Sequence, residues 1–341
     1  TGDDQFNLQD ITANENATLF DVLDGGQGND ALNLNHSVYT LPDSSKIKGI
    51  ENVYLADRSR FTLDHASLDL TAAGSAWNID STSQLIITDD NAMNFASHLA
   101  GTGLVTVDLG SDANAFAFTA NNATDRFTGK VELTHSQFVL NGTTTQNNQA
   151  LSDATLGLGN GSITVVSKGV QQIGSLSFDG GMMNVDTDTL GRSRSEAFLM
   201  TSNDLNIGGR GVVKVLTNDV MNARALPPDT LALTMQDDAN PILKLAGSLG
   251  TVSGYGSNLD LLKADGTTMS DPTYSDVIQK GQVAANATFD FGLTSGASDD
   301  GLYINYGLKK LNLVTSGADA LVINANGASG ASADLAARVT G

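Results

Sequence analysis

The chain of 341 residues contains no cysteine, only five prolines and one tryptophan, and no long apolar run. Without cysteine there are no disulfides, which suits a chain that crosses an oxidising compartment and must stay unlinked, for example when it is threaded through a pore. The alternative is that cysteine is absent by chance from a composition rich in Gly, Asn and Thr. No apolar segment approaches the ~20 residues that span a bilayer, and no signal peptide opens the chain. Because residue 1 is Thr, we expect a fragment whose targeting segments lie elsewhere.

Basic residues are also scarce. There are 18 Lys and Arg against 38 Asp and Glu, which gives a formal net charge of −20. Electrostatic repulsion therefore argues against a nucleic-acid partner and against binding to anionic membrane surfaces.

Glycine is abundant, with 36 residues, and segments that alternate apolar and polar residues recur along the first half of the chain. Most of them end in Asn, Asp, Gly or Ser, which favour turns. Two segments share a template, because Gly2–Leu8 aligns with Gly28–Leu34 at a step of 26 residues, and the next step is 21 to 22. Steps of about 20 to 26 residues are typical of a solenoid. The alternating segments are 5–10, 30–36, 50–57, 67–72, 76–81, 84–90, 104–111, 115–122 and 130–135.

These features predict an all-β fold, a right-handed parallel β-helix with a C-terminal cap rich in hairpins; stacked antiparallel sheets are the alternative. The double proline in 226–233 predicts a break in the coil, and glycine-rich turns predict hairpins at 244–268 and 285–314. In 315–341 the segment "SADLAARV" predicts one or two helical turns. The expected organisation is β-helix rungs at 1–120, further rungs at 121–190, a cap at 191–314 and an Ala/Gly/Ser-rich tail at 315–341.

One stretch, residues 124–186, resembles the passenger-associated transport repeat of autotransporters. The resemblance rests on "FTG" at 127–129, "FVLNG" at 138–142 and "NQALSDATLGLGNGSITV" at 148–165. The chain departs from that pattern at Asp125-Arg126 and at 130–133, where Thr-rich residues are usual.

A second stretch, "ATFDFGLTSGASDDGLYINYGLKKLNL" at 287–313, resembles the end of the autochaperone region of AIDA-type adhesins. Together the two resemblances imply a secreted passenger domain, displayed by a covalently linked outer-membrane β-barrel that this fragment lacks. A stable cap at the C-terminal end would nucleate folding rung by rung. The aromatic residues expected in that cap are Phe289, Phe291, Tyr303 and Tyr306; an ordinary aromatic core of a β-domain is the alternative.

Catalytic motifs are missing. The chain has no G-D-S-G or G-D-S stretch of passenger proteases and esterases, no G-x-S-x-G, no H-E-x-x-H and no phosphate-binding loop. We therefore expect no enzyme activity and no cofactor. The four histidines are expected to lie on the surface or in turns; they are His36, His65, His98 and His135.

An acidic interval marks the N-terminal half. Between Arg60 and Arg126 there is no Lys or Arg, while eight Asp occur. Aspartates on adjacent rungs suit a polysaccharide-cleaving enzyme, but an enzyme for acidic glycans would also need a cation to neutralise its substrate. The interval is either a solubilising surface or a face that binds cationic or hydroxyl-rich partners, or calcium that bridges to another cell. The candidate binding residues are Asp57, just before this interval, and Asp64, Asp80, Asp89 and Asp90 within it.

The segment Gly25–Asn33 fits one calcium-binding nonapeptide of a β-roll. Calcium in such rolls lies between tandem copies, and no second copy follows. We therefore interpret the segment as a tight turn capped by Asp30 through an Asx interaction, with calcium as the weaker alternative. Arg192 and Arg194 form a rare basic spot that suits an anionic glycan; a solvated loop is the alternative. The candidate binding loops are 141–150, 187–196 and 217–230.

The expected function is that of a surface-displayed adhesin passenger, which promotes aggregation and biofilm formation or attachment to a host. Its partners would be a host matrix protein, a glycan, or the same protein on another cell, bound through many weak contacts along the rod. Two alternatives remain: a glycan-cleaving β-helix, and a passive stalk that presents an upstream domain.

Overall fold

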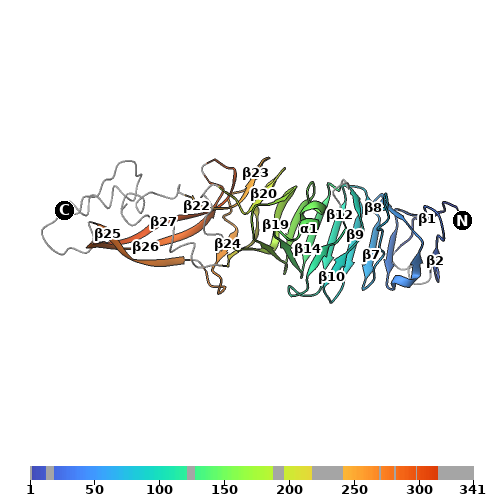
Figure 1. Ribbon diagram of the computed structural model, residues 1–341, viewed down its shortest axis with the longest axis horizontal. Coiled ribbons are helices and arrows are strands. Elements are labelled where there is room, and N and C mark those ends of the chain that lie inside the picture. Colours follow the sequence, from blue (N-terminus) through green and yellow to red (C-terminus); the bar gives the residue numbers. More distant parts are fainter. Residues whose placement is uncertain are drawn as a thin grey trace.

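The computed structural model describes residues 2–12, 19–120, 127–186, 196–216, 241–268, 270–279, 282–296 and 298–313, with the backbone alone at 241–243, 270–279, 282–291 and 305–313. Figure 1 shows a rod in which strands stack along the long axis, with the antiparallel strands β25, β26 and β27 at the end opposite to the N-terminus. Parallel strands form a solenoid of about 7 turns. One turn is called a rung below. Among the described residues, no helix is long and apolar enough to cross a bilayer.

Two long parallel sheets form the main walls of the solenoid. The first sheet contains β1 (Gln5–Gln9), β3 (Ala31–Asn35), β6 (Asn52–Ala56), β8 (Ala76–Ile79) and β11 (Leu99–Gly101), in that spatial order. The second sheet runs through β4 (Val38–Leu41), β7 (Arg60–Asp64), β9 (Gln84–Thr88), β12 (Leu104–Asp108), β14 (Lys130–Thr134), β16 (Thr155–Gly159), β19 (Ser175–Val185), β17 (Ile163–Val166) and β15 (Gln137–Leu140), and β19 also pairs with β21 (Leu205–Val215).

Shorter elements close each rung. The pairs are β2 (Leu23–Asp24) with β5 (Ile47–Lys48), β10 (Met93–Phe95) with β13 (Phe116–Phe118), and β18 (Gln171–Ile173) with β20 (Leu199–Thr201). A 3₁₀ turn covers Ser44–Lys46, and the helix α1 (Thr145–Ala150) lies within the loop expected at 141–150.

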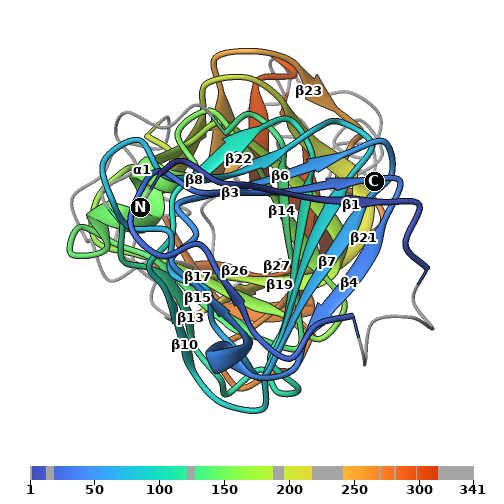
Figure 2. The same cartoon turned by 90° about the vertical axis from the view of Figure 1, so that its right-hand side faces the viewer.

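The strand register confirms the repeat that the sequence predicts. Phe6 lies opposite Leu32 at a step of 26 residues, and Leu32 lies opposite Val53 at a step of 21. Viewed from the N-terminal end, the chain runs clockwise as it recedes, so the coil is right-handed (Figure 2), the hand expected of parallel crossovers.

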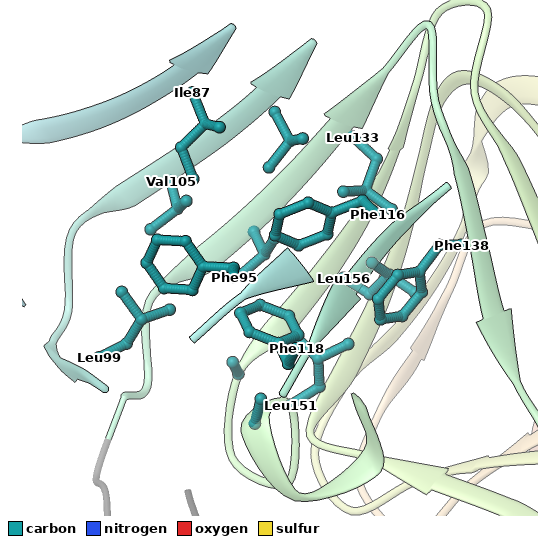
Figure 3. Close-up of a cluster of buried hydrophobic side chains, with 14 of the residues drawn as sticks. Ile87, Phe95, Leu99, Val105, Phe116, Phe118, Leu133, Phe138, Leu151 and Leu156 are labelled. Carbon is teal, nitrogen blue, oxygen red and sulfur yellow. The ribbon is translucent and has the colours of Figure 1, made fainter. Parts of the chain in front are cut away.

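The core consists of the inward-facing residues of the solenoid strands whose side chains are described. Phe20, Tyr39, Phe61 and Trp77 follow one another along the axis, with ring centroids 5.3, 5.2 and 4.9 Å apart. Further along, Phe95, Phe116, Phe118 and Phe138 make a second group of contacting rings among buried leucines and valines (Figure 3). Each such pair contributes about 0.5–1.5 kcal/mol beyond its burial. The column of rings therefore links successive rungs energetically.

Buried serines mark the corner between the first and second sheets. The backbone N–H of Ser37 donates to Ser59 Oγ at 3.0 Å, and that of Ser59 donates to Ser83 Oγ at 3.1 Å. Ser59 Oγ in turn donates to the carbonyl of Ala56 at 2.6 Å. Each hydroxyl thus satisfies a corner N–H of the preceding rung, a group that would otherwise be buried unpaired.

The C-terminal part changes to antiparallel pairing. β26 (Gln282–Thr294) pairs antiparallel with β27 (Gly301–Leu313) and with β25 (Ser270–Gln279), which confirms the hairpin expected at 285–314. The strand β22 (Pro241–Ser248) pairs parallel with β20 on one side and antiparallel with β27 on the other. The antiparallel strands therefore continue directly from a sheet of the solenoid.

The prediction of a hairpin at 244–268 is wrong. These residues make another rung instead, because β23 (Val252–Ser253) and β24 (Leu259–Leu262) both pair parallel with β21. The glycines there allow corners of the coil rather than a reversal of direction: Gly254 has φ +83° and packs against the backbone of Gly208, where a Cβ would clash. Parallel stacking thus continues well past residue 191.

The alternating segment at 67–72 does not form a strand either, although Leu68 and Leu70 are buried. The N–H of Leu70 donates to Ser97 Oγ of the next rung at 2.8 Å, so a side chain takes the place of a strand partner. The double proline within 226–233 and the tail 315–341 lie outside the described residues.

Candidate binding surfaces

The carboxyl ends of the second sheet bring polar side chains into one row. Asp64 lies opposite Thr88, Thr88 opposite Asp108, and Asp108 opposite Thr134. Parallel strands end at the same edge of a sheet, and successive strands lie ~4.8 Å apart, so the row follows the rod axis. We call this edge, from Asp64 to His135, the second corner.

His65 joins two aspartates at the second corner. Its backbone has φ 51°, a left-handed conformation that turns the chain after β7. Nδ1 lies 2.9 Å from Asp64 Oδ1, and Nε2 lies 3.2 Å from Asp90 Oδ2 on the next rung. The hydrogen bonds to Asp64 and Asp90 raise the pKa of His65 above its usual value. The imidazole is exposed and carries positive charge more readily than a free histidine.

His135 repeats this arrangement farther along. Its φ is 37°, and Nδ1 lies 3.1 Å from Asp108 Oδ2. Burial raises the pKa of Asp108, but hydrogen bonds from the Gly110 N–H and from His135 lower it more, so the net pKa is below the usual value. Asp108 is therefore an ionised acceptor that connects two rungs.

The first corner, where the first sheet meets the second, carries a different group. His36 Nδ1 lies 3.4 Å from Asp57 Oδ2, and the N–H of Asp57 donates to Asp80 Oδ2 at 2.9 Å. Burial raises the pKa of Asp80, but hydrogen bonds from Asp57 N–H, Ser83 and Thr82 outweigh it and lower the pKa. Arg58 lies at the same corner, with Nε 3.3 Å from Asp57 Oδ1.

The aspartates expected to form one acidic face therefore lie at two corners. Asp57 and Asp80 are at the first corner, and Asp64 and Asp90 meet through His65 at the second, a strand length away. Asp89 lies beside them but binds its own turn, because its Oδ1 accepts the N–H groups of Asp90 and Asn91. The aspartates thus stabilise turns and rung contacts as well as charging the surface.

His36, His65 and His135 lie in exposed turns, as expected, while His98 is partly buried just before β11. The pairing of the first three with aspartates was not predicted from the sequence. The pairs His36–Asp57, His65–Asp90 and His135–Asp108 are separated by 21, 25 and 27 residues. Each separation is about one rung, which is the signal that could have revealed them.

Sequence analysis also missed an ion-pair cluster on the outer face of the second sheet. Lys130 Nζ lies 2.8 Å from both Glu132 Oε2 and Asp179 Oδ2. The Lys130 side chain crosses Gly157 of the intervening strand, where a Cβ would collide with it. Burial lowers the pKa of Lys130, but the two carboxylates outweigh it and raise the pKa.

Asp30 does not cap its own turn by an Asx interaction, contrary to expectation. It is fully buried, and its Oδ1 accepts the N–H of Asp4 one rung earlier at 2.6 Å. Its N–H donates to Glu51 Oε2 at 2.7 Å, so Asp30 connects three rungs. Across the described parts of the chain, no three His, Cys, Asp or Glu residues are grouped as a metal site would require.

The remaining predicted residues are described in part. Arg192, Arg194 and the loop 217–230 lie outside the described residues, as does nearly all of 187–196. Tyr303 is buried in β27. For Phe289, Phe291 and Tyr306 only the backbone is described, and Phe291 lies opposite Tyr306 in the β26–β27 pair.

Two proteins of Escherichia coli (strain K12) are similar in sequence. A segment of 259 residues, 75% of this chain, is 37% identical to 18% of the uncharacterized protein YuaQ. Over an alignment of 260 positions, which covers 71% of the chain and 19% of the relative, the chain is 32% identical to the uncharacterized lipoprotein YdeK. No protein-family model and no solved structure matches. The chain thus spans about a fifth of the length of the curated relatives that it matches.

Proposed function

We propose that this chain is part of an autotransporter passenger that is displayed at the bacterial surface and acts as an adhesin. The observation that carries the proposal is the joint between β22 and β27. A parallel sheet of the solenoid ends on an antiparallel hairpin formed by 282–313, which contains the segment 287–313 that resembles an autochaperone. Such a hairpin covers the open sheet edge and offers the adjoining, C-terminal rung a template during folding.

The corner chemistry supports binding rather than catalysis. Asp64, Asp90 and Asp108 are held by imidazoles, and Asp80 and Asp89 by backbone N–H groups. Carboxylates engaged in this way connect rungs or stabilise turns, whereas a glycan-cleaving site needs one free base and one proton donor across the substrate.

The relatives support a location in the cell envelope. YdeK is named a lipoprotein, and a lipid anchor fixes a protein to a membrane surface. Export beyond the outer membrane is part of the proposal.

The test is to label intact cells that produce the complete natural protein with an antibody raised against residues 19–120. We expect labelling without permeabilisation, and attachment to matrix proteins, glycans or sister cells that is lost when these residues are deleted in frame. Labelling only after permeabilisation would contradict surface display. If cells with the natural protein are labelled but the deletion leaves attachment unchanged, the segment acts as a stalk.

A further inference from the structure

The outer face of the first sheet carries no charged side chain. Its central row contains Asn7, Asn33, Tyr54 and Asn78 on four successive strands. Within the strands the outward positions on either side of this row are Gln, Asn and Ala, and the charged Asp80 directly follows the end of β8. In a chain of net charge −20, a neutral area over four rungs is unusual. We call it the amide strip.

Tyr54 stands at the middle of the strip with 43% of its surface exposed. Asn33 Nδ2 donates to Asn7 Oδ1 at 3.0 Å, which orients both amides along the axis. Asn78 Nδ2 donates to the carbonyl of Ala76 at 3.2 Å. Among the described residues no partner accepts from or donates to Asn33 Oδ1, Asn78 Oδ1 or the Tyr54 hydroxyl, so these groups face solvent with free hydrogen-bonding capacity.

The strip is small and flat. Four strands ~4.8 Å apart and five residues of ~3.3 Å each give an area on the order of 200 Å². A stable protein–protein interface needs about 800 Å² on each partner. A second copy of this chain would also bring two strongly negative molecules together. The area and the charge therefore argue against a protein partner on the strip.

The chemistry of the strip matches a sugar chain. Amides donate and accept hydrogen bonds at once, as sugar hydroxyls do, and an exposed aromatic ring covers the apolar C–H face of a sugar ring. An anionic glycan would need Lys or Arg, which the strip lacks, and the surrounding negative charge would repel it. Arg58, two residues after the end of β6, lies at the first corner and contacts Asp57.

We propose that the amide strip binds a short segment of a neutral, hydroxyl-rich glycan, with Tyr54 stacked on a sugar ring and the amides of Asn33 and Asn78 hydrogen-bonded to its hydroxyls. This inference names the partner class of the proposed adhesin and rests on that proposal.

The test measures binding of the full chain to immobilised neutral polysaccharides (a glucan, a mannan, a galactan and a chitin oligosaccharide), with heparin and the immobilised chain itself as comparators. We expect saturable binding to at least one neutral glycan, insensitive to salt.

Tyr54→Ala and Asn33→Asp should each weaken this glycan binding by about tenfold or more, a factor that 1.4 kcal/mol supplies. Tyr255→Ala is the matched control, because Tyr255 is 72% exposed but lies in the turn before β24. Circular dichroism confirms that each variant is folded.

Several results would overturn the inference. They are no binding to any neutral glycan, binding that survives both strip substitutions, salt-sensitive binding to heparin alone, or capture of the chain by itself alone. Cells that stay labelled and attached when they carry Tyr54→Ala would refute the strip while leaving surface adhesion standing. Failure of labelling on intact cells would refute the display proposal, whatever the purified chain binds.

Discussion

Lys244 Nζ lies 2.8 Å from Asp300 Oδ2, and this ion pair joins the solenoid to the antiparallel end. Lys244 belongs to β22, and Asp300 directly precedes β27. The hydroxyl of Tyr303 donates to Asp300 Oδ1 at 2.7 Å, and Lys244 Nζ lies 5.2 Å from the centre of the Tyr303 ring. Burial lowers the pKa of Lys244, but Asp300 and Tyr303 outweigh it and raise the pKa. The joint therefore contains a charged Lys244 that is nearly enclosed.

Lys244→Met should lower the free energy of unfolding by about 1–3 kcal/mol, because it removes the charged hydrogen bond to Asp300. Urea unfolding measures the change. Lys48→Met, at an exposed lysine with no ion pair among the described residues, should change it by less than about 0.5 kcal/mol. A double-mutant cycle with Asp300→Asn isolates the pair, and a coupling energy near zero would contradict the role of the joint.

Deleting residues 287–313 should slow or abolish folding and surface display, because the last rung then loses its antiparallel partner. Refolding from urea, followed by circular dichroism, measures the rate. Gly301→Val is a milder version, since a Cβ at Gly301 would clash with the carbonyl of Ala246 in β22. If the truncated chain refolds at an undiminished rate, the hairpin is not a folding cap.

His65 should titrate above ~6.5, its ordinary pKa, because Asp64 and Asp90 stabilise the protonated ring. A raised folded-state pKa means that the associated stability is fully present below the unfolded pKa. That stability is lost as the pH rises through the folded pKa. NMR titration of the ring gives the pKa directly. Asp90→Asn should lower it, whereas Asp89→Asn should leave it nearly unchanged, because Asp89 binds its own turn. Equal effects of the two variants would contradict the cross-rung pairing.

Ser59→Ala should destabilise the protein by about 1–3 kcal/mol, because the buried N–H of Ser37 loses its acceptor. Thermal unfolding with a matched urea series measures the loss. Ser81→Ala is the control: Ser81 lies in the exposed part of the next corner, so its replacement should have little effect. Equal losses of stability for both variants would show that the buried corner serines, Ser37, Ser59 and Ser83, contribute nothing specific.

The alternation of apolar and polar residues and the shared Gly2 and Gly28 templates were enough to predict a solenoid and the register of its first two rungs. Both signals are local, since alternation sets which side chains face inward and the template sets the step. The segment 244–268 was misread because glycine-rich turns look alike in sequence. Whether such a turn reverses the chain or rounds a corner depends on the rung beneath, here β21.

The candidate surfaces were harder to predict. His65 meets Asp90, and Lys130 meets Asp179, only because particular numbers of residues lie in the intervening turns. The step between described rungs is 19 residues from Ile163 to Met182, 29 from Leu176 to Leu205, and 47 from Leu205 to Val252. A constant period therefore cannot assign cross-rung neighbours. The amide strip could be recognised only once the register of the first sheet and the exposure of Tyr54 were known.

The stacking of rungs has a mechanical consequence. In the two long sheets the strands run across the rod, so the hydrogen bonds between rungs point roughly along its length. Tension along the rod pulls these bonds apart in a line, one pair of rungs at a time, instead of shearing a whole sheet. The aromatic rings and the buried serines Ser37, Ser59 and Ser83 also cross some of the boundaries between rungs. Under flow, a tethered rod of this kind would yield first at the boundary with the fewest such links and extend by one rung at each step.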